Sequence, residues 1–453
     1  MSWRTTTAIL CLYGAVKEFR PATPFLTPFL ASPEKNITLD ELYSQVYPYW
    51  TYSYMLALIP MFILTDILRY KPIVMIEAIG LVATWALLVF GKGVWQMQIM
   101  QVSFGVASAA EIAYYSYIYS IVDRKHYKRA TSYIRAAALM GKLVAFGLGQ
   151  TLISTHTSDY LVLNQISLGA VCLVTIIAIF LPRVKSEKAK VSMRAHEIVE
   201  QQTVESVESV QTPKAVKMSY TREYFKKISE ELQICSKNQE LLKWSLWWAL
   251  ASCGVYQVQN YTQSLWKELQ NNPDDVANGV VEFVNTALGA FLSLFIHHLS
   301  IDWTRHGQMI LFITSAIVAV LLYLCSQTTT VLVAYSSYVV ITSIYHMLIT
   351  AASANVAKEL SSNNHGLIFG CNTFVAVCLQ SLLTLVVVDS RFLHLDIRTQ
   401  FVIYSGYFAL VASIFAFFFM ISLFSKSSNA HTAQTTYEAT NEIQEETVFL
   451  DQN

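Results

Sequence analysis

Charged residues are scarce in this chain. They make up 14% of its 453 residues, whereas hydrophobic residues make up 54% and the mean hydropathy is +0.41. Soluble globular chains carry about 25% charged residues. Because apolar stretches of about 20 residues recur along the chain, the composition predicts a polytopic membrane protein surrounded by a lipid bilayer. The formal net charge is zero and there is no strongly basic patch, so we expect no nucleic-acid partner.

The sequence also lacks the motifs of the common enzyme classes. It contains no G-x-x-x-x-G-K-[ST] phosphate loop, so nothing indicates that ATP drives its work. It has no nucleophile elbow and no H-E-x-x-H, and its seven cysteines show no C-x-x-C or Cys/His metal spacing. We therefore expect neither a metal nor a cofactor. An intramembrane enzyme and a membrane receptor are the weaker alternative classes.

Twelve apolar segments are candidate membrane-spanning helices, in two groups of six. The first group comprises residues 7–30, 46–66, 71–91, 95–122, 127–154 and 160–182, and the second comprises 242–268, 276–298, 307–326, 330–356, 365–389 and 399–424. These segments predict an all-α protein with two six-helix halves, residues 1–182 and 242–424. We expect a partly disordered linker at 183–241 and a disordered tail at 425–453, because both are polar and poor in core-forming residues.

The distribution of basic residues predicts the orientation in the membrane. Arg69 and Lys71 follow the second span, four basic residues lie at 124–129 after the fourth, and the linker carries more. The even-numbered loops, the linker and both termini are therefore expected on the cytosolic side of a plasma membrane. The sequon that begins at Asn36 then lies outside the cell, where it predicts N-glycosylation.

Six plus six helices around a cytosolic linker is the layout of the major facilitator fold. The segment "TDILRYKP" strengthens this prediction, because Asp66, Arg69 and Lys71 resemble the signature of that superfamily between the second and third spans. The alternative is that these residues only anchor the helix ends at the membrane surface. Carriers of this fold bind substrate near the midplane between the halves and alternate access around it.

Glu111 lies inside the fourth predicted span, in "AAEIAYYSYIYSIV" at 109–122. A carboxylate at the centre of a membrane helix costs roughly 2.5–3.5 kcal/mol on insertion scales, so it should face the interior or a cavity. Lys142, in the fifth span, reaches a similar depth at a rise of about 1.5 Å per residue. We therefore expect a Glu111–Lys142 salt bridge, or a substrate that competes for one of the two partners.

Several long segments resemble one known family. They are "FRPATPFLTPFL" at 19–30, "YPYWTYSYM" at 47–55, "LTDILRYKP" at 64–72, "AAEIAYYSYIYSIV" at 109–122, "WSLWWALASCGVYQVQNY" at 244–261 and "IFGCNTF" at 368–374. Through them the chain resembles the reduced folate and thiamine carriers over essentially all of its spans, but not in the linker or the tail. The resemblance implies facilitated or exchange transport of a B vitamin, with a coupling proton or a counter-anion as the open partner.

Three positions bear on the substrate that this resemblance implies. At Glu111 the folate carriers have arginine and the thiamine carriers glutamate. At His346 the folate carriers have arginine, and at Gln380 they have lysine where the thiamine carriers have glutamine. All three positions lack the folate-type cation, and a carboxylate suits the fixed positive charge of thiamine.

The chain also departs from the family. Both branches carry glutamate where this chain has Thr23 and Gln101, and Lys142 stands at a position that is uncharged in the family. Glu18, close before Thr23, is a candidate replacement for a lost carboxylate. These departures leave the identity of the substrate open but do not affect the predicted fold.

Aromatic and amide residues complete the expected binding site. Trp50 and Tyr54 match family positions near the cavity, and Trp50 is suited to stacking on a flat heterocycle. Asn260 is expected to bind a ring edge from the opposite half. For each of them, packing between helices is the alternative interpretation. We expect Arg20 to anchor a break in the first helix beside Pro21 and Arg135 to belong to a cytosolic gate.

The sequence therefore predicts a carrier of a B vitamin that works by alternating access. Thiamine or a similar heteroaromatic cation is favoured over folate, and a related metabolite is the third alternative.

Overall fold

The computed structural model describes residues 3–422 except 69, 122–126, 182–232, 234–237, 271–275, 296–301 and 360–364. The predicted linker and tail therefore lie largely outside the described residues. In the amino-terminal half the long helices are α1 (Trp3–Glu18), α4 (Pro48–Leu68), α5 (Lys71–Phe90), α6 (Gly93–Ile121), α7 (Tyr127–Ser154) and α8 (Tyr160–Phe180). In the carboxy-terminal half they are α11 (Gln239–Leu269), α12 (Asn278–Phe295), α13 (Trp303–Gln327), α14 (Val331–Glu359), α15 (His365–Val387) and a last helix, Ile397–Ser422.

The predicted all-α class is confirmed, since the described residues contain helices and no strand. Each predicted span coincides with one long helix, although the first is interrupted. Seven of the described helices are long and apolar enough to cross a membrane by length and composition. α1, with 16 residues, is too short to do so alone. The count of twelve membrane spans therefore remains a prediction.

The interruption of the first span lies beside Pro21, where a break was expected. Proline lacks a backbone N–H and disfavours helical geometry at the residue before it, so α1 ends at Glu18. The chain continues through the short helices η1 (Thr23–Phe25) and α2 (Leu26–Leu30). The carbonyl oxygens of Thr23 and Pro24 lie in this short segment after the break. They accept hydrogen bonds from Gln263 and Asn278 of the other half, at 3.1 and 3.0 Å.

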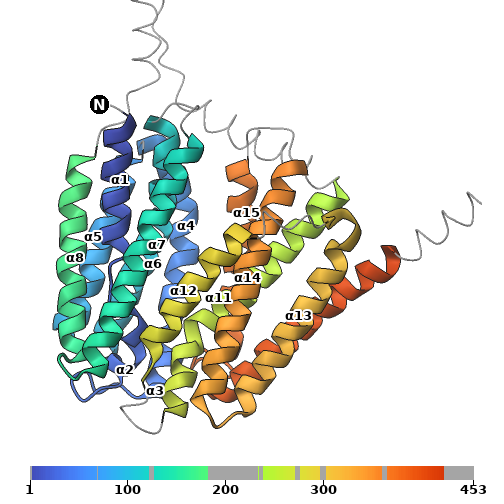
Figure 1. The fold of residues 1–453 in the computed structure, drawn as a ribbon. Helices are drawn as coiled ribbons and strands as arrows, with labels where there is room; N and C mark the ends of the chain where they lie inside the picture. The colour runs from blue at the N-terminus through green and yellow to red at the C-terminus, as the bar shows by residue number, and fades with distance from the viewer. Residues whose placement is uncertain are drawn as a thin grey trace, which may run out of the picture.

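The two halves stand side by side (Figure 1). Trp3 marks one end of the molecule, which we call the Trp3 end. The short helices α2, α3 (Leu39–Glu41) and η2 (Leu42–Val46) mark the other, the α3 end. Between the halves, α7 packs on α12 and α4 packs on α15.

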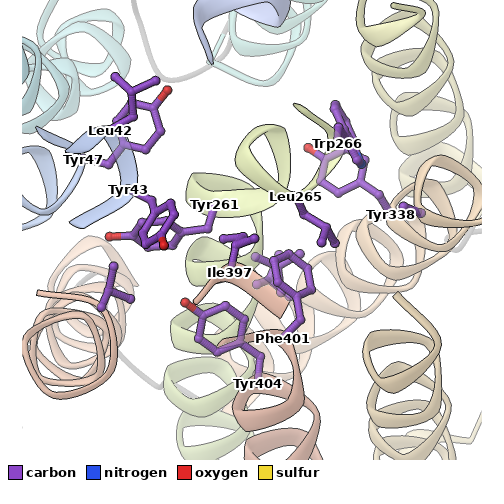
Figure 2. Packing of buried hydrophobic residues seen from close by; sticks show 14 of the residues in the cluster. Leu42, Tyr43, Tyr47, Tyr261, Leu265, Trp266, Tyr338, Ile397, Phe401 and Tyr404 are labelled. Atoms are coloured by element: carbon purple, nitrogen blue, oxygen red, sulfur yellow. The ribbon is translucent and has the colours of Figure 1, made fainter. Parts of the chain in front are cut away.

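A hydrophobic cluster shared by both halves joins them at the α3 end. Figure 2 shows Leu42, Tyr43 and Tyr47 of the amino-terminal half in the same hydrophobic cluster as side chains of the other half, among them Tyr261, Leu265, Phe401 and Tyr404. Polar contacts add to this closure: Tyr52 donates to Asp389 at 2.8 Å, and His394 lies 3.1 Å from Asp40. Apolar burial and cross-half hydrogen bonds therefore close this end of the molecule.

Within the amino-terminal half, α7 lies directly against α1. Gly141 makes this approach possible, because a Cβ at that position would collide with the backbone of Ala15. The next residue, Lys142, is thereby placed beside the end of α1. The close packing that Gly141 permits therefore brings the Lys142 side chain within reach of residues at the end of α1.

Candidate functional site: two adjoining cavities and an ion network

The smaller of two adjoining cavities lies between the halves and has a volume of about 210 Å³. Aromatic rings from both halves line it, including Trp50, Trp85 and Phe104 on one side and Tyr256 on the other. Carboxamides do the same: Gln101 and Asn164 face Gln259, Asn260 and Gln263. No lining residue carries a formal charge, so the cavity is suited to a flat ring with hydrogen-bonding edges.

Trp50 presents a fixed aromatic surface in this cavity. Its ring is stacked on Tyr54, with centroids 5.6 Å apart and planes at 13°, and its Nε1 donates to Ser108 at 3.3 Å. Gly105 lets α4 approach α6 at this point, since a Cβ there would meet the backbone of Trp50 and Tyr54. Tyr54 itself does not line this cavity, and its contribution is the stacking contact with the Trp50 ring.

Four polar atoms of residues that line the smaller cavity have no hydrogen-bond partner among the described residues, and two of them are Trp85 Nε1 and Asn164 Oδ1. The other two are the Asn260 side-chain nitrogen and the Thr23 hydroxyl oxygen, and all four are buried. Buried polar groups are nearly always hydrogen-bonded, so unpartnered ones in a cavity are available to a ligand. Asn260 thus lies where the sequence predicted a ring-edge donor.

The larger cavity adjoins the smaller one and measures about 880 Å³. Thr23, Gln259 and Gln263 line both. The larger cavity is markedly more polar, since its lining includes Glu18, Arg20, Arg135, Lys142, Glu282 and His346. It extends along α7, α12 and α14 to Arg135, which is exposed and lies toward the Trp3 end.

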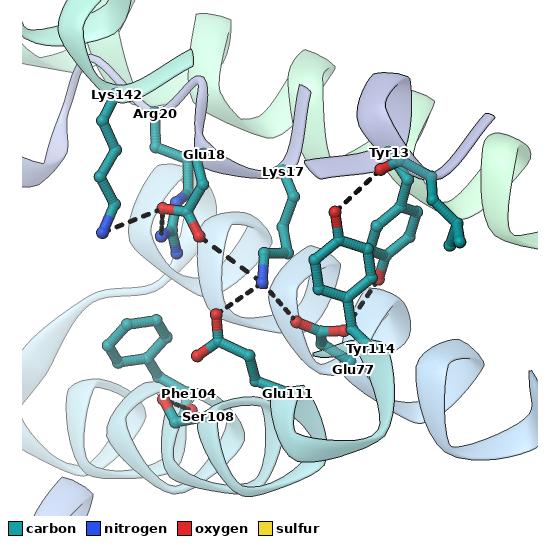
Figure 3. Close-up of polar contacts among 11 residues, drawn as sticks. Tyr13, Lys17, Glu18, Arg20, Glu77, Phe104, Ser108, Glu111, Tyr114 and Lys142 are labelled. Atoms are coloured by element: carbon teal, nitrogen blue, oxygen red, sulfur yellow. Dashed lines mark hydrogen bonds and ion pairs between the residues drawn. The ribbon is translucent and has the colours of Figure 1, made fainter. Parts of the chain in front are cut away.

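An ion network lies in the amino-terminal half beside these cavities (Figure 3). Lys17, which is 2% exposed, contacts Glu111 at 2.7 Å, Glu77 at 3.0 Å and Glu18 at 3.5 Å. Arg20 and Lys142 contact the second oxygen of Glu18 at 2.9 and 3.4 Å. Three cations and three carboxylates thus share the network, and their formal charges cancel. Buried ions are tolerated when they are paired in this way.

The expected Glu111–Lys142 salt bridge is wrong. Glu111 pairs with Lys17, and Lys142 pairs with Glu18. The last two residues of α1, Lys17 and Glu18, lie between the two side chains and supply the partner of each. Glu111 lines neither described cavity, although its side chain is 36% exposed. The two residues remain connected, because Lys17 and Glu18 also contact each other.

The remaining residues predicted to bind substrate divide into three groups. Gln101 lines the smaller cavity, as Trp50 does. His346 lines the larger one. Gln380 lines neither: it is fully buried in the carboxy-terminal half, and neither polar atom of its amide has a hydrogen-bond partner among the described residues.

The predicted structural and gate residues are also distributed over different places. Arg20 pairs with Glu18 at the helix break, and its guanidinium lies over the Trp85 ring. Lys71 donates to the carbonyls of Ile179 and Leu181, so it fastens α5 to the end of α8. Arg69 and the side chain of Asp66 lie outside the described part of the structure. Asn36 is exposed between α2 and α3, and its glycosylation remains a prediction.

Three charged residues of the site were not singled out from the sequence: Lys17, Glu77 and Glu282. Each lies inside a predicted span, so the cost of burying charge that drew attention to Glu111 applied equally to them. Glu77 accepts hydrogen bonds from Lys17 and Tyr13, each at 3.0 Å.

No cluster of three metal-ligating side chains occurs in the portion of the chain that the structure describes.

Known proteins with the same fold are transporters. Over 91% of this chain, a POT family transporter solved with 5-aminolevulinic acid superposes with a TM-score of 0.61 at 10% sequence identity and 95% coverage of its own chain. A D-xylose-proton symporter superposes over the same share with a TM-score of 0.60 at 11% identity and 97% coverage. These likenesses confirm the major facilitator fold.

Sequence relatives are nearer. The chain is 38% identical to thiamine transporter 1 of Mus musculus, with 94% of this chain and 91% of the relative covered. It is 41% identical to folate-like transporter 3 of Caenorhabditis elegans, with 91% and 95% covered, and 32% identical to the reduced folate transporter of Homo sapiens, with 91% and 72% covered. The family model for the reduced folate carrier matches residues 1–403. The chain therefore belongs to the reduced folate carrier family, which is a family of membrane transporters and not of enzymes.

Proposed function

We propose that this protein carries a B vitamin across the plasma membrane by alternating access, with thiamine or a similar heteroaromatic cation as its substrate. Membership of the reduced folate carrier family and the major facilitator fold support the transport class. Relatives named as thiamine transporters support the substrate class. The observation that carries the proposal is the smaller cavity, where aromatic rings and amides from both halves converge without any formal charge.

Each part of that cavity has a role in the proposal. Trp50 stacks on the heteroaromatic ring, and its own stacking on Tyr54 fixes the plane that it presents. The Asn260 amide and the Thr23 hydroxyl bind the ring edge, because both have unused hydrogen-bonding capacity. Gln101 contributes a further amide from α6. Both halves thus hold the ring, as alternating access around a fixed site requires.

Folate transport is the second candidate, and the larger cavity favours it. Arg20, Arg135 and Lys142 line that cavity and could hold an anionic tail while the ring occupies the smaller one. Arg20 and Lys142 are, however, already paired with Glu18. Of the three cations, only Arg135 has no ion-pair partner among the described residues. We therefore favour the cationic substrate.

The proposed orientation places both termini and the linker in the cytosol. The larger cavity then leads toward the cytosol, and the α3 end, where the halves are joined, faces outside. An epitope tag inserted in the 183–241 linker should be reached by antibody only after the cell is permeabilised. A tag that is accessible on intact cells contradicts this orientation.

Transport by purified protein in ATP-free liposomes tests the proposed function. Liposomes preloaded with unlabelled thiamine should take up labelled thiamine, and those preloaded with folate should take up labelled folate weakly or not at all. The opposite preference would establish the folate alternative. A requirement for nucleotide would end the carrier proposal. Imposing a pH gradient or an internal anion then distinguishes a coupling proton from a counter-anion.

A further inference from the structure

Glu282 differs from every carboxylate in the ion network. The three network carboxylates are each within 3.0 Å of a lysine or arginine nitrogen. Glu282 has no ion-pair partner among the described residues, yet it lines the larger cavity from α12. An intramembrane carboxylate without a counter-ion is costly and marks a functional site by default.

Neutral groups hold this carboxylate in a fixed position. Tyr338 donates to one oxygen at 2.9 Å, and the Asn285 amide donates to the other at 3.2 Å. Thr342 in turn donates to the Asn285 oxygen at 2.6 Å, which orients the amide toward Glu282. The Tyr338 ring is held edge-on against Trp266, with centroids 5.1 Å apart. A carboxylate has about four acceptor positions, so these two bonds leave capacity for a ligand.

The surrounding charges do not already satisfy Glu282. The charge of Lys142 acts on Glu282, but its ammonium contacts Glu18. Arg20 contacts Glu18 as well, and Arg135 is exposed on the third turn of α7. The same Lys142 charge acts on His346. The partner missing at Glu282 is therefore a positive charge that the cavity itself does not supply.

We propose that Glu282, positioned by Tyr338 and Asn285, is a binding site for the positive charge of an organic cation in the larger cavity. This inference rests on the proposed function and extends it. The ring of the substrate binds in the smaller cavity. Its cationic group binds at Glu282 in the larger cavity, which shares the lining residues Thr23, Gln259 and Gln263 with the smaller one.

The test compares two ligands that differ in one charge. Purified full-length protein is titrated with thiamine and with 3-deazathiamine, in which a neutral thiophene ring replaces the thiazolium. Glu282→Gln keeps the shape of the side chain and removes its charge. We expect it to weaken thiamine binding about tenfold, as loss of about 1.4 kcal/mol would, and to change the Kd of the neutral analogue less than twofold. Ser413→Ala, a neutral change at an exposed position of the same half, should leave both unchanged.

Two results would overturn the inference: unchanged thiamine affinity in Glu282→Gln, or equal weakening of both ligands. If Glu282→Gln yields no folded protein, Tyr338→Phe replaces it. That variant keeps the charge but loses one positioning bond, so we expect thiamine binding to weaken about threefold with the neutral analogue unaffected. Unchanged thiamine affinity in Tyr338→Phe, or equal weakening of both ligands, would count against the site.

A third ligand separates this inference from the proposed function. If wild-type protein binds neither thiamine nor its analogue, the proposed function fails. The cation site is then judged with benzyltrimethylammonium, which should raise the melting temperature of wild-type protein but not that of Glu282→Gln. Equal stabilisation of both proteins, or of neither, would contradict the cation site.

Discussion

The two halves of the molecule stabilise their buried polar groups differently. The amino-terminal half uses full charges: Lys17 alone contacts Glu18, Glu77 and Glu111. Apart from Asp389, which pairs with Arg391 at the α3 end, the interior of the carboxy-terminal half uses neutral groups. There the Gln257 amide donates to Tyr404 at 3.1 Å and accepts from Thr384 at 3.0 Å, and Gln270 donates to Asn278 and Tyr335.

This difference has energetic consequences. Removing one member of a buried ion pair leaves an uncompensated charge, whereas removing one member of a neutral network leaves an unsatisfied dipole. The amino-terminal half should therefore be the more sensitive to single substitutions. The difference between the halves also explains why Glu282 is unusual. It is a carboxylate of the carboxy-terminal half whose hydrogen-bond donors, Tyr338 and Asn285, are neutral.

Substitution of Lys17 should have the largest effect. Lys17→Met leaves three carboxylates without their shared cation, and we expect a loss of about 3–5 kcal/mol of stability. Surface biotinylation and size-exclusion chromatography should then show markedly less folded protein than for wild type. Lys92→Met, which alters an exposed lysine of the same half, is the matched control and should behave like wild type. Normal folding of Lys17→Met would show that the network is not required.

A neutral substitution in the other half should cost less. Gln257 is fully buried, and Gln257→Leu leaves the hydroxyls of Thr384 and Tyr404 without this partner. We expect a loss of about 1–3 kcal/mol, visible as a lowered melting temperature with folded protein retained. A loss equal to or greater than that of Lys17→Met would break the comparison between the halves.

Double-mutant cycles sharpen the assignment of partners inside the ion network. Lys17 and Glu111 are in direct contact, so Lys17→Met and Glu111→Gln should show a coupling of about 1 kcal/mol or more. Glu111 and Lys142 are linked only through two intervening residues, so Glu111→Gln and Lys142→Met should combine almost additively. Chemical unfolding of the four proteins in each cycle provides the measurement. Strong coupling in the second cycle alone would restore the salt bridge that the structure contradicts.

The smallest predicted effect is the pH dependence of the closure at the α3 end. Burial would raise the pKa of Asp389, but hydrogen bonds from Arg391 and Tyr52 outweigh it and hold the pKa below its ordinary value of 3.8. A lowered carboxyl pKa stabilises the protein above the ordinary value, and this stabilisation is lost as the pH falls through the lowered value.

Tyr52→Phe tests this closure. It should lower the melting temperature by a constant amount between pH 5 and 8, corresponding to about 1 kcal/mol, and the difference should shrink below about pH 4 as the carboxylate is protonated. Tyr133→Phe, at an exposed position, is the control. A difference that instead grew toward low pH would have the wrong sign for a depressed carboxyl pKa.

Much of the fold could be predicted from the sequence because hydropathy and helix-breaking prolines are local signals. The apolar segments correspond to the long helices, and Pro21 marks the break after Glu18. The rotation of each helix about its axis is not local. Glu111 and Lys142 were expected to pair at a common depth, yet each side chain pairs with a residue of α1 instead.

The aromatic and amide lining of the smaller cavity was predicted in part, whereas most of the ion network beside it was missed. Trp50, Gln101 and Asn260 were recognised through the family resemblance, and all three line the smaller cavity. Lys17 and Glu77 were overlooked although each is a charge inside an apolar span. Even with all six network charges identified, three cations and three carboxylates permit several pairings, and the packing of the helices selects among them, as the close approach of α7 to α1 at Gly141 places Lys142 beside Glu18.

The central claim is that the uncharged aromatic cavity between the halves binds the heteroaromatic ring of the substrate. Thiamine binding to purified Trp50→Leu tests it most directly, with Trp95→Leu, at a 69% exposed position of the same half, as the control. The account predicts that Trp50→Leu folds and binds thiamine about tenfold more weakly, in line with roughly 1–3 kcal/mol for a ring stacked on an aromatic side chain, while Trp95→Leu binds it normally. Unchanged thiamine affinity in folded Trp50→Leu would contradict the claim.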